Sequence, residues 1–250
     1  MQRRIDFNCD LGEGCGNDAA IMPYISSANV ACAAHAGDES SMRSTLRLCR
    51  QFKVSAGAHP GFADREHFGR LERTWTAREI RTLISEQLVR LAEIAGQEGV
   101  RLVHMKPHGA LYNQAARDPE LASVVAEAVR DFDAGMILVG LAGSELPRAG
   151  EAAGLRVLHE AFADRRYLDD GSLAPRSLQG SVVAKHADAI EQARSIVLRN
   201  CVSTLDGNSL ALQADSICLH GDRDDAAEFA RRLHQALVEA DVTIQAPQLD

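Results

Sequence analysis

The sequence predicts an α/β protein with parallel strands, either an open doubly wound sheet or a βα barrel. Seven short apolar runs rich in β-branched residues are spaced along the chain, and stretches with helical periodicity lie between them. The length of 250 residues suits one large α/β domain. We therefore expect a single domain over residues 1–250, because no linker, low-complexity tract or repeat divides the chain.

The predicted strands are short and bounded by polar or glycine-containing segments. They cover residues 4–9, 28–34, 54–59, 101–106, 135–140, 156–162 and 216–220. The predicted helices have apolar residues at intervals of three and four, and they cover residues 39–52, 77–97, 118–131, 187–199 and 224–240. Thr76 and Asp118-Pro119 are suitable helix starts, since proline is tolerated in the first helical turn.

One segment interrupts the alternation of strands and helices. Residues 201–214, CVSTLDGNSLALQA, contain two short alternating runs around Asp206-Gly207. Such a dipeptide favours a type I′ turn, so we expect a small β-hairpin here.

Composition excludes several classes of function. The formal net charge is −8, whereas proteins that bind nucleic-acid phosphates carry clustered Lys and Arg. No apolar segment reaches the roughly 18 residues needed to cross a bilayer, and the N-terminus MQRRIDFNCD lacks the features of a signal peptide. We expect a soluble cytoplasmic protein that binds neither nucleic acid nor membrane.

The cysteines and lysines are informative through their positions. The six cysteines form no C-x-x-C pair, which argues against a structural zinc site or a disulfide framework and favours reduced thiols. Only three of the 27 cationic residues are lysines, namely Lys53, Lys106 and Lys185. Lys106 follows a predicted strand and has histidines on both sides, so we expect a site that needs a compact, titratable ammonium group.

Ionisable residues follow six of the seven predicted strands. In parallel α/β folds, sites form from the segments beyond the carboxyl ends of the strands. In chain order these residues are Asp10 and Glu13, His35 and Asp38, His59, Lys106 and His108, Glu160 with Asp164 and Arg165, and finally His220 and Asp222. Their convergence predicts one functional site.

Glycine accompanies the histidines at these strand ends. His35, His59, His108 and His220 each have a glycine one or two residues later, which allows a sharp turn and a close approach of ligand to backbone. The glycines of GEGCGN at 12–17 do not have the G-x-G-x-x-G spacing, and G-x-x-x-x-G-K-[ST] is absent from the sequence. The motifs therefore indicate a site without a standard nucleotide-binding loop.

Six ordered segments resemble the LamB/YcsF family: NCDLGEG, SANVACAAHAGD, GAHPGF, KPHGALYN, EAFADRRY followed by DGSLAPR, and CLHGD. The resemblance runs from residue 5 to about residue 240. This sequence departs from the family's ACGFHAGD at Ala33 and Ala34, and from GEGFG at Cys15, without losing an ionisable group.

The resemblance implies a seven-stranded parallel βα barrel related to the glycoside hydrolase and polysaccharide deacetylase barrels. It also implies an ATP-dependent cyclic amide hydrolase, a 5-oxoprolinase component that works with subunits B and C. Together they would open 5-oxo-L-proline to L-glutamate, with ATP and Mg as co-substrate.

On this hypothesis the strand-end residues divide into two groups. Lys106 and Arg165 would meet the charge of the substrate carboxylate or of a phosphorylated amide oxygen. Catalytic roles in positioning water or moving protons are expected for Asp10, Glu13, His35, Asp38, His59, Lys106 and His108. Substrate-binding roles are expected for Glu160, Asp164, Arg165, His220 and Asp222.

Two alternatives stay open at this point. The first is a stand-alone metal-dependent hydrolase, with ligands from Asp10, His35 and either Asp38 or His59; the leading candidates are Asp10, His35 and His59. The second is a non-catalytic subunit that binds a small acid while its partners perform the chemistry.

Overall fold

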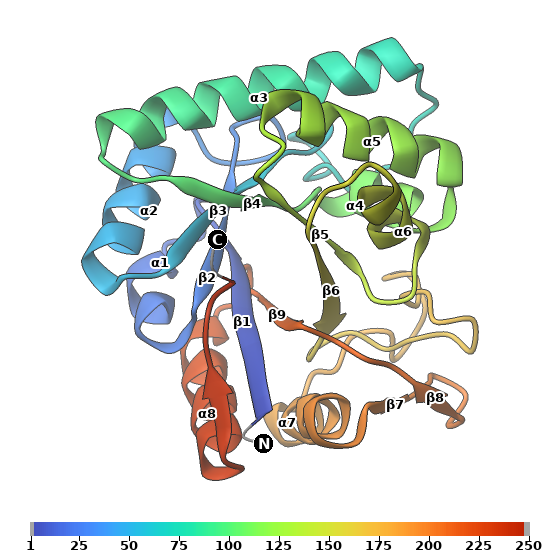
Figure 1. Cartoon of the computed structure of the whole chain (residues 1–250). Coiled ribbons are helices and arrows are strands. Elements are labelled where there is room, and N and C mark those ends of the chain that lie inside the picture. The colour runs from blue at the N-terminus through green and yellow to red at the C-terminus, as the bar shows by residue number, and fades with distance from the viewer. Residues whose placement is uncertain (1–2, 248–250) are drawn as a thin grey trace.

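The computed structural model describes residues 3–247 and has a closed barrel of parallel strands at its centre (Figure 1). The order of the barrel strands is β1-β2-β3-β4-β5-β6-β9, and the pairing of β9 with β1 closes it. These strands are β1 (Arg3–Leu11), β2 (Ser27–Ala31), β3 (Ser55–His59), β4 (Leu102–Met105), β5 (Ile137–Leu141), β6 (Val157–Phe162) and β9 (Ser216–His220). All seven predicted strands and the barrel itself are confirmed; residues 1–2 and 248–250 of the predicted domain lie outside the described residues.

A short eighth strand extends the sheet outside the barrel. β10 (Val242–Ile244) pairs in parallel with the beginning of β1, where Arg3 lies opposite Val242. The sequence analysis missed this strand, because three residues are too few to show an alternating pattern. The remainder of β1 pairs with β2 and β9.

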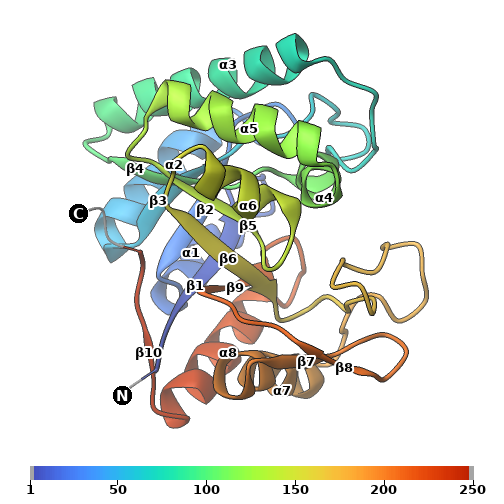
Figure 2. The same ribbon diagram turned by 45° about the vertical axis from the view of Figure 1, so that its right-hand side comes forward.

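Five helices correspond to the predicted helical segments: α2 (Glu39–Phe52), α3 (Ala77–Gln97), α5 (Pro119–Phe132), α7 (His186–Arg194) and α8 (Ala226–Glu239). Both predicted helix starts are confirmed. The Thr76 side chain accepts a hydrogen bond from the backbone N–H of Glu79, and Asp118 caps α5 with Pro119 in its first turn. Helices α3 and α5 lie side by side along one flank of the barrel (Figures 1 and 2).

The helical content exceeds the prediction in four short segments: α1 (Asp18–Ile21), the 3₁₀ turn η1 (Met22–Tyr24), α4 (Gly109–Arg117) and α6 (Glu145–Ala152). Each is too short to show several turns of apolar periodicity. The predicted helix 187–199 is also divided, because α7 ends at Arg194 and the π-helical turn η2 (Ser195–Arg199) follows it.

The predicted hairpin is present, but its turn type was wrong. β7 (Cys201–Ser203) and β8 (Ser209–Ala211) pair antiparallel. Gly207 has φ 85° and donates its N–H to the carbonyl of Thr204, whereas Asp206 has no positive φ as a type I′ turn would require. The hairpin projects on the same side of the barrel as the segment between β6 and α7 (Figure 2), and Leu205 N–H donates to the carbonyl of Tyr167.

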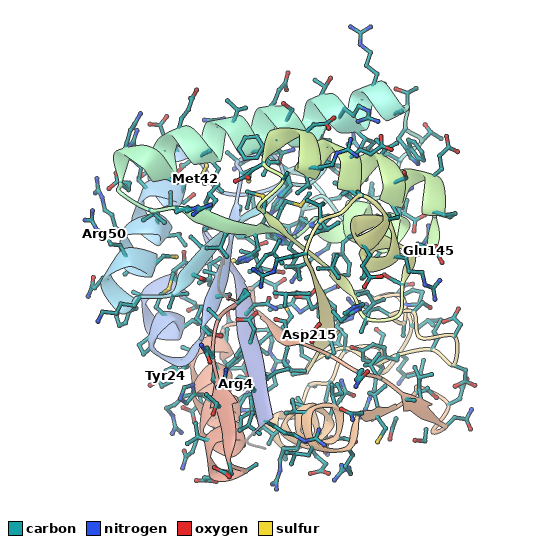
Figure 3. All side chains as sticks on the ribbon, in the orientation of Figure 1. Arg4, Tyr24, Met42, Arg50, Glu145 and Asp215 are labelled. Atoms are coloured by element: carbon teal, nitrogen blue, oxygen red, sulfur yellow. The ribbon has the colours of Figure 1, made fainter. Side chains whose placement is uncertain are left out.

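Apolar side chains fill the layer between the barrel and its helices. On α2, Met42 is buried while Arg50 projects outward and is exposed (Figure 3). The six cysteines are free thiols, as expected. Within residues 3–247, no helix combines the length and apolar character required to cross a membrane.

The barrel interior is polar, and this property positions the site. Along β1 the side chains of Asp6, Asn8 and Asp10 share one face, while Phe7 and Cys9 point to the opposite, apolar side. All three polar residues are buried and hydrogen-bonded within the barrel. The inward face of β1 therefore leads directly to the carboxyl ends of the strands.

Candidate active site

The carboxyl ends of the barrel strands surround a cavity of about 830 Å³. Its lining includes six residues that the sequence analysis selected: Asp10, His59, Lys106, His108, Arg165 and His220. Glu13, His35, Glu160 and Asp164 contact these lining residues. The strand ends therefore bring most of the predicted residues together, as expected for a parallel barrel.

Lys106 lies in a buried ion-pair cluster at the base of the cavity. Its Nζ is 2.9 Å from Asp10 Oδ1 and 2.8 Å from Glu160 Oε1, and it donates to Cys218 Sγ at 3.1 Å. Burial alone would lower the pKa of Lys106, but the two carboxylates hold it well above its usual value. Lys106 is therefore a fixed cation.

The acidic partner Asp10 stays ionised for a related reason. Burial opposes its charge, but His59 and Lys106 hold the pKa of this carboxyl well below its usual value. Asn29 Nδ2 also donates to Asp10 Oδ1 at 2.8 Å. The cluster thus contains one ammonium and carboxylates held by further donors.

Side chains deeper in the barrel fix the second acidic partner, Glu160. Asn8 Nδ2 donates to Glu160 Oε1 at 2.9 Å, and the Tyr112 hydroxyl donates to Oε2 at 2.7 Å. His104 Nε2 is 2.8 Å from Asn29 Oδ1, which orients the amide that reaches Asp10. These hydrogen bonds fix the Glu160 and Asp10 carboxylates, which in turn hold the Lys106 ammonium in position.

Three histidines and one glutamate form a second cluster beside Asp10. His59 Nδ1 is 2.8 Å from the carbonyl oxygen of Lys106, and His108 Nε2 is 2.8 Å from that of Phe68. Carbonyl oxygens only accept hydrogen bonds, so these two nitrogens carry the ring protons. In the neutral rings, His59 Nε2 and His108 Nδ1 then present lone pairs to one another at 3.0 Å.

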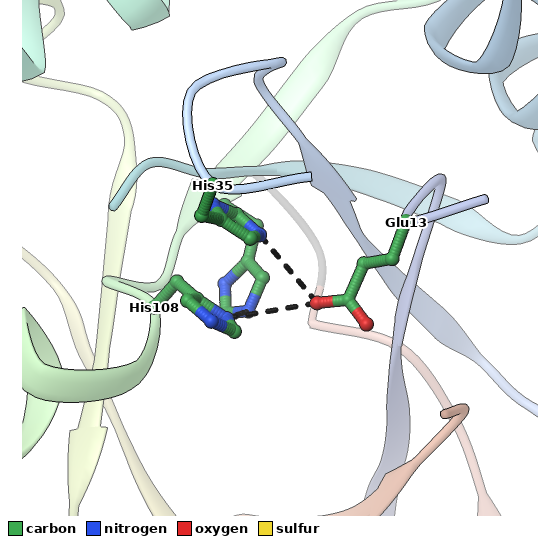
Figure 4. A group of neighbouring side chains, drawn as sticks. Glu13, His35 and His108 are labelled. Carbon is green, nitrogen blue, oxygen red and sulfur yellow. Dashed lines mark hydrogen bonds and ion pairs between the residues drawn. The ribbon is translucent and has the colours of Figure 1, made fainter. Parts of the chain in front are cut away.

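His35 and Glu13 complete this cluster (Figure 4). Glu13 Oε1 is 3.5 Å from His35 Nε2 and 3.6 Å from His108 Nδ1, and the rings of His35 and His108 are stacked with centroids 3.7 Å apart. Both ring nitrogens of His35, and Glu13 Oε1, are buried without a hydrogen-bond partner. The desolvation of these polar atoms is not offset by any hydrogen bond within the described chain.

Burial favours the neutral forms of His35, His108 and Glu13. It lowers the pKa of His35 to about 3 and that of His108 well below its usual value. It also raises the pKa of Glu13 well above its usual value, with further contributions from the charges of Asp10 and Asp222.

A histidine–carboxylate pair lies on β9 and in the loop after β6. His220 Nδ1 is 3.0 Å from both Asp164 oxygens, and its ring stacks on Phe162 with centroids 5.5 Å apart. Nδ1 therefore donates to the carboxylate, and Nε2 is left as an acceptor at the cavity wall.

Several arginines line the cavity. Arg70, Arg165 and Arg176 line it, and Arg70 pairs with Asp222. Burial lowers the pKa of Arg165 to about 10, assisted by the positive charge of Arg176. Arg165 Nε is buried without a hydrogen-bond partner. The cavity is therefore suited to an anion.

Asp38 is the predicted residue that the structure places apart from the cavity. It lies at the start of α2, where its carboxylate accepts the backbone N–H of Ser41 at 2.8 Å in a capping box. Sequence reasoning missed Asn8, Asn29, His104, Tyr112, Arg70 and Arg176. The first three lie inside strands, and the arginines lie in long loops, so the search for strand-end residues could not find them.

The sequence of this chain is similar to one family of known proteins over nearly its whole length. A profile of the LamB/YcsF family matches residues 5–249. The A subunit of 5-oxoprolinase from Erwinia tasmaniensis is 50% identical over 93% of this chain and 95% of its own length. That of Neisseria meningitidis serogroup A is 45% identical over 98% of this chain and its entire length.

Solved structures agree with the architecture. The lactam utilization protein from Thermus thermophilus has a TM-score of 0.91 and 41% identity, covering 98% of this chain and 100% of that one. A T48 deacetylase with substrate has a TM-score of 0.51 and 15% identity, covering 97% and 87% of the two chains, which shows a shared barrel fold alone. The chain belongs to the LamB/YcsF family.

Proposed function

We propose that this chain is the A component of a 5-oxoprolinase, which with subunits B and C opens 5-oxo-L-proline to L-glutamate at the expense of ATP. Relatives of 45–50% identity over nearly the whole chain carry the name of this 5-oxoprolinase component. The observation that carries the proposal is the Lys106 ammonium, fixed between two buried carboxylates at the base of an arginine-lined cavity.

Ring opening of a lactam needs activation, because amide resonance makes its carbonyl a poor electrophile. Phosphorylation of the amide oxygen by ATP, with Mg, releases ADP and makes the ring carbon electrophilic. Water can then add to that carbon, and cleavage of the C–N bond with protonation of the nitrogen gives the free amine and an acyl phosphate. A second water hydrolyses the acyl phosphate to the carboxylate of glutamate and inorganic phosphate.

The charges around the cavity suit an anionic substrate. Arg165 and Arg176 in the cavity wall would receive a carboxylate or phosphoryl group, for which guanidinium groups are well shaped. Lys106 would stabilise negative charge that develops on the former amide oxygen. Its two carboxylate partners keep the ammonium in place without requiring reorganisation during the reaction.

His220 is the proton-transfer group that the geometry favours. Asp164 holds its Nδ1 proton, so Nε2 can take a proton from attacking water and return it to the ring nitrogen that leaves. His220 and Asp164, which were expected from the sequence to bind substrate, would therefore act in proton transfer.

Glutamate formation from 5-oxoproline and ATP tests the proposal. This chain alone, subunits B and C alone, and all three together should give product only in the full mixture. In that mixture, Lys106→Met should lower kcat by about 100-fold or more, the cost of losing one such electrostatic contact. Lys185→Met, an exposed lysine outside the cavity, should retain the rate.

The His220→Gln variant tests the role of His220. It should lower kcat by about 100-fold, because glutamine cannot accept a proton. Absence of product from a mixture whose three components are folded and associated would contradict the assigned function. Full activity of the Lys106 and His220 variants would contradict the assigned site.

We also propose that the protein acts in the cytoplasm. Its six free thiols and the requirement for ATP suit a reducing, nucleotide-containing compartment.

A further inference from the structure

We propose that Glu13, His35, His59 and His108 bind a divalent transition-metal ion of the zinc type. This inference goes beyond the assigned reaction and does not depend on it, since metal binding can be measured without substrate, ATP or partners. The four residues come from the ends or following loops of β1, β2, β3 and β4, so the barrel assembles the set.

The spacing of the donor atoms fits one ion. One ligand atom from each residue can be chosen so that all four lie within 4.8 Å of one another. Four donors at about 2.0–2.1 Å from a tetrahedral zinc ion are separated by about 3.3 Å. The separations of 3.0 Å between His59 Nε2 and His108 Nδ1, and of 3.6 Å between His108 Nδ1 and Glu13 Oε1, lie close to that value.

The hydrogen bonds aim two of the imidazoles as metal ligands. Backbone carbonyls hold the proton of His59 on Nδ1 and that of His108 on Nε2, as the outer partners of ligating histidines commonly do. The remaining lone pairs converge, with Asp10 Oδ2 also 3.3 Å from His59 Nε2. Electron pairs so placed require a cation among them.

A shared proton explains only part of this arrangement. A proton on His59 Nε2 would serve Asp10 and His108, but it would leave His35 and Glu13 Oε1 without partners. His35 is 1% exposed and makes no hydrogen bond through either nitrogen. Its ring can therefore turn toward an ion without breaking a hydrogen bond, whereas backbone carbonyls hold His59 and His108 in place.

The surrounding backbone makes room for the three rings. A Cβ on Gly61 would lie 3.0 Å from both His108 Cβ and His35 Nδ1. Gly69 has φ +63°, and a Cβ there would lie 2.9 Å from His35 Cβ. Side chains at these two positions would crowd the cluster, so the glycines keep the rings close together.

The donor set selects the class of metal. Neutral imidazoles suit zinc, cobalt, nickel and copper, whereas calcium and magnesium prefer oxygen ligands. The nearby ammonium of Lys106 does not repel the ion with a full charge, because Asp10 and Glu160 both pair with it. When bound, such an ion would polarise a carbonyl oxygen as a Lewis acid.

Metal binding to the full chain, free of any affinity tag, tests the proposal. Protein stripped with a chelator should bind Co²⁺ with one equivalent giving visible d–d absorption, and Zn²⁺ should displace it and raise the Tm. His35→Gln should weaken Zn²⁺ affinity by more than the roughly 10–100-fold loss typical of changes to outer partners of ligands. Its metal-free Tm should fall only slightly, because the change removes ring packing on His108 and Phe68 but no hydrogen bond.

Glu13→Gln and His108→Ala should also lose Co²⁺ absorption, with folding checked by circular dichroism. His159→Ala provides the matched control, because the side chain of this histidine pairs with the exposed Glu151 and should leave binding unchanged. Absence of Co²⁺ and Zn²⁺ binding in the wild type would overturn the proposal, as would binding that all three cluster variants retain. Neither result bears on glutamate formation, so the two proposals fail separately.

Discussion

Replacing Lys106 with methionine should destabilise the protein and do so more at neutral than at acidic pH. The change keeps a side chain of similar length but leaves Asp10 and Glu160 as buried carboxylates without their cation. Breaking a buried ion pair by removing one partner costs about 3–5 kcal/mol. We expect the lower end, about 3 kcal/mol, because Asn29 still donates to Asp10 and Tyr112 still donates to Glu160.

The pH dependence follows from the pKa of Asp10. In the wild type this pKa is depressed, so the stability from Asp10 is present above its unfolded value near 3.9 and is lost only as pH falls through the lower folded value. Without Lys106, His59 still lowers the pKa of Asp10 but one of the two opposing groups is gone, so burial raises that pKa relative to the wild type and uptake of a proton relieves part of the cost in mild acid. The difference in unfolding free energy between wild type and variant should therefore be smaller at pH 5 than at pH 8.

Urea unfolding of the chain at both pH values measures this difference, with Lys185→Met as the matched control. The double variant Lys106→Met with Asp10→Asn should be more stable than Lys106→Met alone at pH 8, because one uncompensated charge is gone. A difference that is equal at both pH values, or larger at pH 5, would refute the electrostatic reasoning.

Three further substitutions test other contacts. Gly57→Ala would place a Cβ 2.2 Å from the His104 ring, and urea unfolding should show a loss of about 2–3 kcal/mol. Asp38→Ala removes the cap of α2, so stability should fall by about 1 kcal/mol while kcat is kept; a fall in kcat of tenfold or more would restore its predicted catalytic role. Tyr112→Phe leaves Glu160 Oε2 without its 2.7 Å donor and should cost about 1–2 kcal/mol in the same assay.

The sequence predicted the barrel strands well because each one is a compact apolar run between helices. It missed α4 because the helix is nine residues long and starts within the KPHG motif, where His108 is the residue before the first turn. Helix α6 was missed for the same reason of length. The turn at Asp206-Gly207 was assigned from two residues, whereas hydrogen bonds to Thr204 decide its type.

The sequence also predicted most of the site, since parallel strands must bring their carboxyl ends together. It placed Lys106, His108 and Asp10 at one cavity without any knowledge of the strand order. It could not predict that His59 and His108 face each other, because register and backbone carbonyls determine the direction of the rings. Arg176 lies in the long segment between β6 and α7, whose path no local pattern determines.

One signal for the deeper polar residues was present in the sequence. IDFNCDL alternates apolar and acidic or amide residues, which places Asp6, Asn8 and Asp10 on one face of a strand. In a barrel with an apolar outer layer, that face can only be the interior. Burying polar side chains in the barrel interior costs desolvation free energy, so these side chains must form hydrogen bonds with one another.

The hydrogen bonds between these interior side chains connect the barrel to the site. Ser216 and Ser27 donate to Asp6 at the lower level, and Asn8 donates to Ser216 and to Glu160 above it. Glu160 and Asp10 then hold Lys106 at the cavity.

Hydrogen bonds are satisfied along this column, whereas Glu13 Oε1 and both nitrogens of the neighbouring His35 are left without partners. Below the site His104 Nδ1 is a single buried atom without a partner, whereas beside the site three such atoms lie together on two neighbouring residues, and this grouping positions them for a ligand.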